Sequence, residues 1–259
     1  MAEVAASNAR LPEATLSEID GVRYLHLGSI WVQGAMRLAA PQVVELAYVQ
    51  RMLAALLWLD PARLRQGHAV QLGLGAGTLT RFTLRTLGMR TTAVELNPQV
   101  IQACRAWFRL PADGPRLQVV CADAGAWLRA AEPASAQLLL VDLYDEEAAA
   151  PVLDDLRFYT DCRRLLAPGG VMAVNLFGRH HAFGASLARI VEVFGGDAVW
   201  RLRATREGNT VVIASRAAPL PPRTELAARA ATIEANWAAL GLPARKWLRL
   251  LQPGLPAGA

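Results

Sequence analysis

Apolar runs and helical patterns alternate along the middle of this chain of 259 residues. Short apolar runs with the length of buried strands occupy residues 69–74, 91–95, 117–121, 137–142 and 171–176. Segments with helical periodicity lie between them, at residues 78–87, 98–108, 124–131 and 154–166. Strands and helices that alternate in this way predict a parallel sheet with helices on both faces.

The end of this region breaks the alternation. Residues 198–203 and 210–215 have strand patterns and are separated only by a short turn around Gly208-Asn209, so we expect them to pair antiparallel. A mostly parallel sheet that ends in an antiparallel hairpin resembles the S-adenosylmethionine-methyltransferase-like Rossmann fold, which is an α/β fold.

Smaller regions are expected on either side of this core. The Asp20-Gly21 pair predicts a hairpin turn after a frayed leader over residues 1–15. Residues 43–59 predict a mostly buried helix, and the tail predicts two helices separated at residues 241–243. The expected division is a short N-terminal β region (1–44), a Rossmann-like nucleoside-binding catalytic domain (45–216) and a C-terminal helical tail (217–259).

A glycine-rich loop follows the first strand of the alternating region. Gly73, Gly75 and Gly77 give the spacing GxGxG, and Thr78 stands where a dinucleotide-binding loop carries its third glycine. Glycines allow a tight turn and a close approach of the backbone to a ligand, and amides at the following helix start offer donors. The loop therefore favours a nucleoside without pyrophosphate, although loops of this kind also serve packing alone.

The next two strands both end in carboxylates. Glu95 follows the loop by about twenty residues, the spacing at which an acid reaches a ribose diol. Asp123 ends the third strand, where it either accepts a hydrogen bond from an adenine amino group or caps the following helix. Because ligands of open α/β sheets bind beyond the carboxyl ends of the strands, the three strand ends together favour a nucleoside site.

Two further acids, Asp142 and Asp145, follow the fourth strand. Carboxylates at this edge suit the recognition of a cation or the deprotonation of an amine. The alternative interpretation is a solvated acidic loop, which applies more strongly to Glu146 and Glu147 than to Asp142.

The chain resembles the spermidine synthase (polyamine aminopropyltransferase) family over residues 33–175. The stretches that carry the resemblance are Val32-Gln33-Gly34-Ala35-Met36, Glu45-Leu46-Ala47-Tyr48, the glycine loop, Val94-Glu95-Leu96-Asn97-Pro98, Asp142-x-x-Asp145 and Phe158-Tyr159. The resemblance implies a transferase of polyamine biosynthesis that moves an aminopropyl group from decarboxylated S-adenosylmethionine to a polyamine such as putrescine.

The same resemblance implies roles for individual residues. Asp142 would be the general base for the attacking amine, with Asp145 as the second acid of the motif. Gln33 and Tyr48 would line the donor and amine site. Glu95 would hold the ribose, and Asp123 the adenine.

Several residues depart from the family pattern. The glycine loop has Ala76 where the family usually has an acid that holds the amino end of the donor. Val49 and Gln50 replace the histidine and glutamate of the family's Tyr-His-Glu. These departures leave open two alternatives: a methyltransferase that uses intact S-adenosylmethionine, and a catalytically silent nucleoside-binding relative.

Composition excludes some partners and is neutral about others. No apolar run is long enough for a membrane span, and no signal pattern begins the chain, so a cytoplasmic protein is expected. The net charge is +5, but the arginines are scattered in the sequence, and we expect no nucleic-acid partner.

No spacing of histidine, cysteine and acid predicts a metal site. The expected partner is a small-molecule amine, and a homodimer is a possible assembly.

Overall fold

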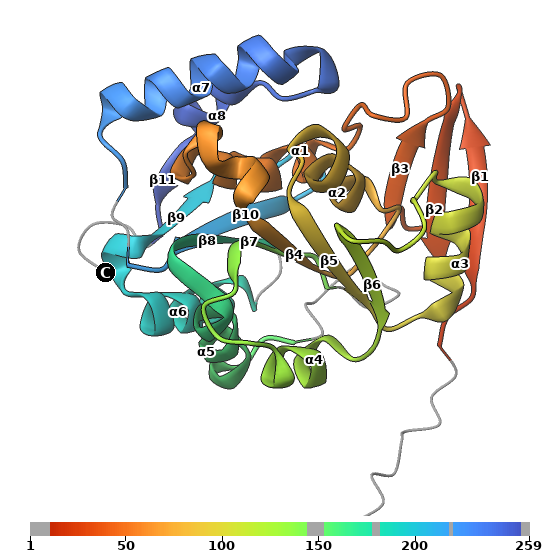
Figure 1. Cartoon of the computed structure of the whole chain (residues 1–259), viewed down its shortest axis with the longest axis horizontal. Helices are drawn as coiled ribbons and strands as arrows, with labels where there is room; N and C mark the ends of the chain where they lie inside the picture. Colours follow the sequence, from red (N-terminus) through yellow and green to blue (C-terminus); the bar gives the residue numbers. More distant parts are fainter. Residues whose placement is uncertain (1–10, 144–152, 178–181, 218–219, 255–259) are drawn as a thin grey trace, which may run out of the picture.

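The computed structural model describes residues 11–143, 153–177, 182–217 and 220–254. Its centre is an eight-stranded sheet in the order β11-β9-β10-β8-β7-β4-β5-β6 (Figure 1). Pairing is parallel from β6 to β8, and β10, β9 and β11 complete the sheet antiparallel. The strands are β4 (His68–Leu72), β5 (Arg90–Glu95), β6 (Leu117–Cys121), β7 (Ala136–Val141), β8 (Leu166–Phe177), β9 (Val199–Leu202), β10 (Asn209–Ser215) and β11 (Leu251–Pro253).

This arrangement confirms the predicted α/β fold, including the antiparallel hairpin of β9 and β10. Strand β11 is an addition from the C-terminal tail, for which the sequence predicted two helices and no strand. It contains only three residues, too short a run for a periodic pattern to be visible.

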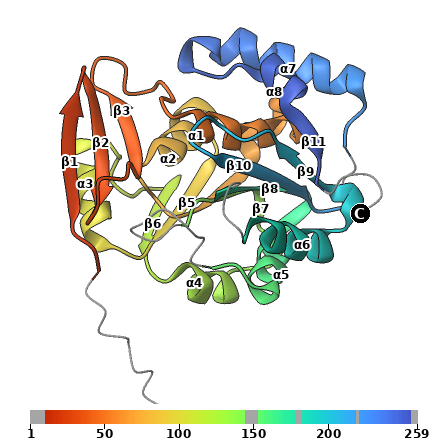
Figure 2. The same ribbon diagram turned by 180° about the vertical axis from the view of Figure 1, so that it is seen from behind.

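The central strands are apolar on both faces because helices cover both (Figures 1 and 2). On β7, Leu138 and Leu140 belong to one core, and Leu139 and Val141 belong to the other. The first core lies under α1 (Ala47–Met52), α7 (Arg223–Trp237) and α8 (Ala244–Leu250), with the 3-10 segments η1 (Leu53–Trp58) and η5 (Ala238–Leu240). The second lies under α4 (Ala124–Ala130), α5 (Leu156–Leu165) and α6 (Phe183–Phe194).

A separate antiparallel sheet of β1 (Ala14–Ile19), β2 (Val22–Leu27) and β3 (Gly34–Arg37) forms the N-terminal region. Asp20 and Gly21 have φ values of 51° and 74°, as the turn of a tight hairpin requires. The predicted end of the frayed leader, at residue 15, is wrong, because β1 already begins at Ala14. This sheet packs against α3 (Pro98–Trp107) and the glycine loop through a third apolar cluster that includes Leu25, Met36 and Phe108.

Two predicted helices have different bounds in the structure. The helix expected over residues 43–59 begins only at Ala47. The Val44 carbonyl, which an earlier helix start would pair with the amide four residues on, accepts from the Gln50 side chain instead, and the Val44 amide donates to the Leu240 carbonyl at 2.9 Å. The helix continues as the 3-10 segment η1 instead of α-helix. After the glycine loop, α2 (Thr78–Arg81) passes into a π-helical turn, η3 (Phe82–Thr86). Among the described residues, the protein contains no helix with the length and apolar character needed to cross a bilayer.

Candidate active site

The glycine loop joins β4 to α2 beside the end of β7. Gly73 has a φ of 85°, and a β-carbon added to it would collide with the Asp142 carbonyl oxygen. Gly75 has a φ of 50°, and its added β-carbon would lie 2.8 Å from the Gln33 carbonyl oxygen. Both positions need glycine, because a side chain would be strained by the backbone angle and blocked by neighbouring backbone. The loop is therefore held directly between β3 and β7.

Side chains from α2 and α3 fix the outer side of the loop. The Arg81 guanidinium is buried and donates to the carbonyls of Ala76 at 2.6 Å and Phe108 at 2.7 Å. Burial lowers the pKa of Arg81 to about 10. The Cys104 thiol donates to the Gly75 carbonyl at 3.0 Å. These contacts were not predicted from the sequence.

Glu95 at the end of β5 is tied to the loop by backbone amides. Its Oε2 accepts from the Leu74 amide and its Oε1 accepts from the Asn97 amide, both at 2.9 Å. Burial raises the pKa of the Glu95 carboxyl, while these amides lower it in part. Each oxygen keeps a further lone pair that can accept a hydrogen bond from a ribose hydroxyl.

Asp123 lies beyond the end of β6, the strand next to β5. Its Oδ1 accepts from the Ala126 amide at 2.7 Å, so it caps α4, which is one of the two roles that its sequence position allowed. The side chain is exposed, which leaves its second oxygen accessible to a ligand. Capping and adenine recognition are therefore compatible at this position.

Asp142 and Tyr48, distant in the sequence, meet at the end of β7. The half-buried Asp142 carboxylate accepts from the Asn175 side-chain amide at 2.9 Å and also hydrogen-bonds the Tyr48 side chain. Burial raises the pKa of Asp142, and the two hydrogen bonds offset part of that rise. Asn175 in turn accepts from the Asn209 amide at 3.2 Å, which fixes its orientation. A carboxylate with a raised pKa and two fixed neighbours is suited to accept a proton.

The other predicted residues have different positions. Gln33 is half-buried just before β3, beside Gly75. Asp145, with Glu146 and Glu147, lies outside the described residues. Asn175 was not predicted as a site residue, although an amide within an otherwise apolar strand was a usable signal.

The three departures from the family pattern have structural roles here. Ala76 is buried in the cluster beneath the N-terminal sheet, and a β-carbon on Gly34 would lie 2.5 Å from the Ala76 β-carbon. Val49 belongs to the first core, and the Gln50 amide donates to the Val44 carbonyl at 2.7 Å. An acid at position 76 would therefore enter an apolar contact between the loop and β3.

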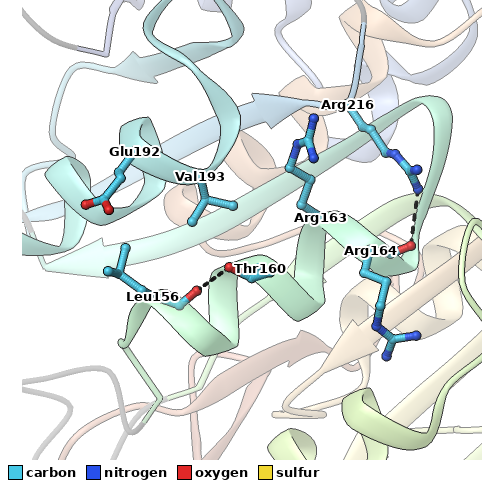
Figure 3. Close-up of a pocket in the computed structure, with 7 residues that line it drawn as sticks. All are labelled: Leu156, Thr160, Arg163, Arg164, Glu192, Val193 and Arg216. Carbon is cyan, nitrogen blue, oxygen red and sulfur yellow. Dashed lines mark hydrogen bonds between the residues drawn. The ribbon is translucent and has the colours of Figure 1, made fainter.

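A hollow of about 530 Å³ lies on the outer side of α5 and α6 and is lined by none of the predicted site residues (Figure 3). Two of its arginines cap helices: Arg164 donates to the carbonyls of Leu128 and Ala131 at the end of α4, and Arg216 donates to the Arg164 carbonyl at the end of α5. Helix capping therefore accounts for the positions of Arg164 and Arg216 in this hollow.

The strand order and the antiparallel hairpin at the end of the sheet define an α/β protein with the methyltransferase-like Rossmann fold. The solved structures that share this fold include the following two. Human methyltransferase-like protein 13 in complex with SAH has a TM-score of 0.67 at 22% identity, covering 75% of this chain and 93% of the other. A probable spermidine synthase from Corynebacterium glutamicum has a TM-score of 0.68 at 21% identity, covering 92% and 90%.

Sequence comparison gives the family. The family model of the spermine/spermidine synthase domain matches residues 68–181. The polyamine aminopropyltransferase of Chromobacterium violaceum is 35% identical over 210 residues, which cover 81% of this chain and 78% of the relative. That of Neisseria meningitidis serogroup A is 34% identical over 209 residues, covering 80% and 78%. The chain belongs to the spermine/spermidine synthase family, as its sequence motifs predicted.

Proposed function

We propose that this protein is a polyamine aminopropyltransferase with decarboxylated S-adenosylmethionine as donor and a small polyamine such as putrescine as acceptor. The observation that carries the proposal is the half-buried Asp142 carboxylate, held by Asn175 and Tyr48 at the same sheet edge as the glycine loop. Its relatives of 34–35% identity are polyamine aminopropyltransferases, which supports the same reaction class.

The reaction needs a neutral amine, because an ammonium nitrogen has no lone pair for attack. The amine nitrogen forms a bond to the methylene carbon next to the sulfonium, the carbon–sulfur bond breaks, and its electrons return to sulfur. Methylthioadenosine leaves as a neutral product, and the proton released from nitrogen passes to Asp142. The raised pKa of Asp142 brings its proton affinity closer to that of the amine, which makes this transfer less unfavourable.

The remaining site residues are proposed to hold the nucleoside. Glu95 accepts from the ribose hydroxyls, and the second oxygen of Asp123 accepts from the adenine amino group. Gly73, Gly75 and Gly77 let the loop backbone approach the nucleoside. Gln33 and Tyr48 line the space between donor and acceptor, and Asp145 is proposed as a second acid for the cationic amine.

A methyltransferase is the second candidate, favoured by one observation. Ala76 places a methyl group, instead of an acid, in the loop, so the loop offers no carboxylate to the amino end of a decarboxylated donor. Intact S-adenosylmethionine carries its own carboxylate and needs a different environment there.

Product analysis separates these functions. The purified protein is incubated with each donor and a panel of diamines and triamines, and the nucleosides are identified by mass spectrometry. We expect methylthioadenosine only with decarboxylated donor plus an amine. S-adenosylhomocysteine as the product would overturn the proposal in favour of methyl transfer. Binding of methylthioadenosine without any turnover would identify a catalytically silent relative.

A further inference from the structure

Arginines and acidic residues are distributed unevenly along the sequence. Between Asp60 and Glu95 the sequence contains five arginines and no aspartate or glutamate. One of the five, Arg81, is buried beneath the glycine loop, whereas Arg63, Arg65, Arg85 and Arg90 are exposed. These residues are scattered in sequence order, which is why the sequence alone did not predict a nucleic-acid partner.

The fold brings two of these exposed arginines, Arg65 and Arg90, together with Arg116 at the amino ends of β5 and β6. Arg90 begins β5, and the Arg116 carbonyl accepts from the neighbouring Thr91 amide at 2.8 Å. The Arg116 guanidinium donates to the Arg65 carbonyl at 3.0 Å. The Arg65 side chain in turn lies against Gly88, two residues before Arg90. We call Arg65, Arg90 and Arg116, with Arg63 and Arg85 from the segments that precede Arg65 and Arg90 in the sequence, the arginine edge.

The positive charge of this edge has little compensation from nearby acids. None of its five arginines forms an ion pair within the described residues. Of the acids nearest in sequence, Asp113 pairs with Arg105, and the Asp60 carboxylate is oriented toward the Ala62 amide, from which it accepts a hydrogen bond. The edge therefore carries exposed guanidinium groups that are available to an anionic partner.

The arginine edge is opposite the candidate active site. Strand β5 runs from Arg90 at one end to Glu95 at the other, and β6 is preceded by Arg116 and followed by Asp123. A six-residue strand is about 17 Å long. A partner bound at the arginine edge would leave the carboxylate edge free for the donor and the amine (Figure 1).

The character of the edge selects one class of partner. Stable protein–protein interfaces have an apolar, often aromatic centre. None of the exposed large hydrophobic side chains of the described residues lies within residues 60–91 or 112–117. A phosphate backbone needs no apolar centre, and guanidinium groups bind phosphate oxygens in a bidentate manner.

We propose that the arginine edge is a binding surface for the sugar–phosphate backbone of nucleic acid, independent of base sequence. None of the five residues of the arginine edge is aromatic, so the edge does not stack on bases through aromatic rings. The affinity for nucleic acid therefore comes from phosphate contacts and from released counterions. Binding of this kind is weakened strongly by salt. It is independent of the aminopropyl reaction.

The test compares two triple variants of the full chain. Arg65→Gln/Arg90→Gln/Arg116→Gln removes the centre of the edge. Arg157→Gln/Arg223→Gln/Arg249→Gln removes three exposed arginines on α5, α7 and α8 and lowers the net charge equally. Binding to a fluorescent 20-base-pair DNA duplex is measured by anisotropy at several salt concentrations, with circular dichroism to confirm folding.

We expect the edge variant to bind at least tenfold more weakly than wild type at low salt and the control variant to stay within about twofold. The slope of log affinity against log salt should fall in magnitude by about 0.9 for each phosphate that the variant no longer neutralises. Equally weakened binding in the two variants would show that only net charge matters and would overturn the proposal. Equal competition by poly-glutamate at matched charge would also overturn it, because the surface would then not distinguish phosphate from carboxylate.

Discussion

Asn175 on β8 donates a side-chain hydrogen bond of 2.9 Å to the carboxylate of Asp142 at the end of β7. The bond joins the proposed general base to β8, a strand that carries none of the predicted site residues. It also acts on proton affinity, because a donor to a carboxylate stabilises the charged form and lowers its pKa.

Replacing Asn175 should therefore change the pH dependence of the reaction. Asn175→Leu removes a hydrogen bond to a charged group, worth about 1.5–3 kcal/mol, and so raises the pKa of Asp142 further. Because the base is active when ionised, we expect the acidic limb of the kcat profile to move to higher pH. Val174 is buried next to Asn175, and Val174→Ile serves as a packing control that should leave the limb in place. If the acidic limb of the Asn175→Leu profile did not shift, the hydrogen bond from Asn175 would have no effect on the pKa of the base.

Asp142→Asn should stabilise the folded protein at neutral pH. Burial raises the pKa of Asp142, so its ionised form opposes folding, and this loss of stability develops as pH rises from the unfolded to the folded pKa. The asparagine keeps an acceptor for Asn175 without the buried charge. We expect a higher Tm than wild type at pH 8 and a smaller difference at pH 4. A lower Tm at pH 8 would show that the carboxylate stabilises the fold.

Glu95→Gln should weaken nucleoside binding. The glutamine keeps the size of the side chain but replaces one of the two acceptor oxygens that the Leu74 and Asn97 amides now contact. We expect the Kd for methylthioadenosine, measured by calorimetry, to rise by about 10- to 100-fold, equivalent to roughly 1.4–3 kcal/mol. The exposed Glu132→Gln is the matched control. Equal affinity in Glu95→Gln and wild type would place the ribose elsewhere.

The contact between Gly34 and Ala76 should tolerate no additional atom. Gly34→Ala places a β-carbon 2.5 Å from that of Ala76, within backbone that is fixed on both sides. Overpacking of this kind costs about 1–3 kcal/mol, so we expect a lower Tm by differential scanning fluorimetry and weaker binding of methylthioadenosine. Gly114→Ala is the control, because nothing lies within 4 Å of its added β-carbon. The same Tm in both variants would contradict the close approach of β3 to the loop.

Much of the fold follows from local patterns, whereas the details of the site depend on long-range contacts. The strands that lead to Gly73, Glu95 and Asp142 were visible because each is a buried apolar run with a polar end. The contact between Tyr48 and Asp142 was not predictable from spacing, since it depends on how α1 lies across the sheet. For the same reason, the predicted bounds of the helix at residues 43–59 were wrong: tertiary contacts of the Val44 carbonyl with the Gln50 side chain and of the Val44 amide with Leu240 override the local helical preference before Ala47.

Single side chains were ambiguous where one residue type serves two purposes. Asp123 caps α4 and also faces the site edge, so its sequence supported both interpretations. Arg81 was not predicted as a buried residue because arginine is usually exposed, and only the packed loop shows that its guanidinium binds backbone carbonyls.

The role of Asp142 is tested most directly by the rate of methylthioadenosine release in Asp142→Asn, with decarboxylated donor and the preferred amine. Calorimetry with methylthioadenosine confirms beforehand that the variant still binds nucleoside with wild-type affinity. We expect kcat to fall by about 10²- to 10⁴-fold, the range typical for loss of a general base. Release at the wild-type rate would contradict the assignment of Asp142 as the base and, with it, the proposed mechanism.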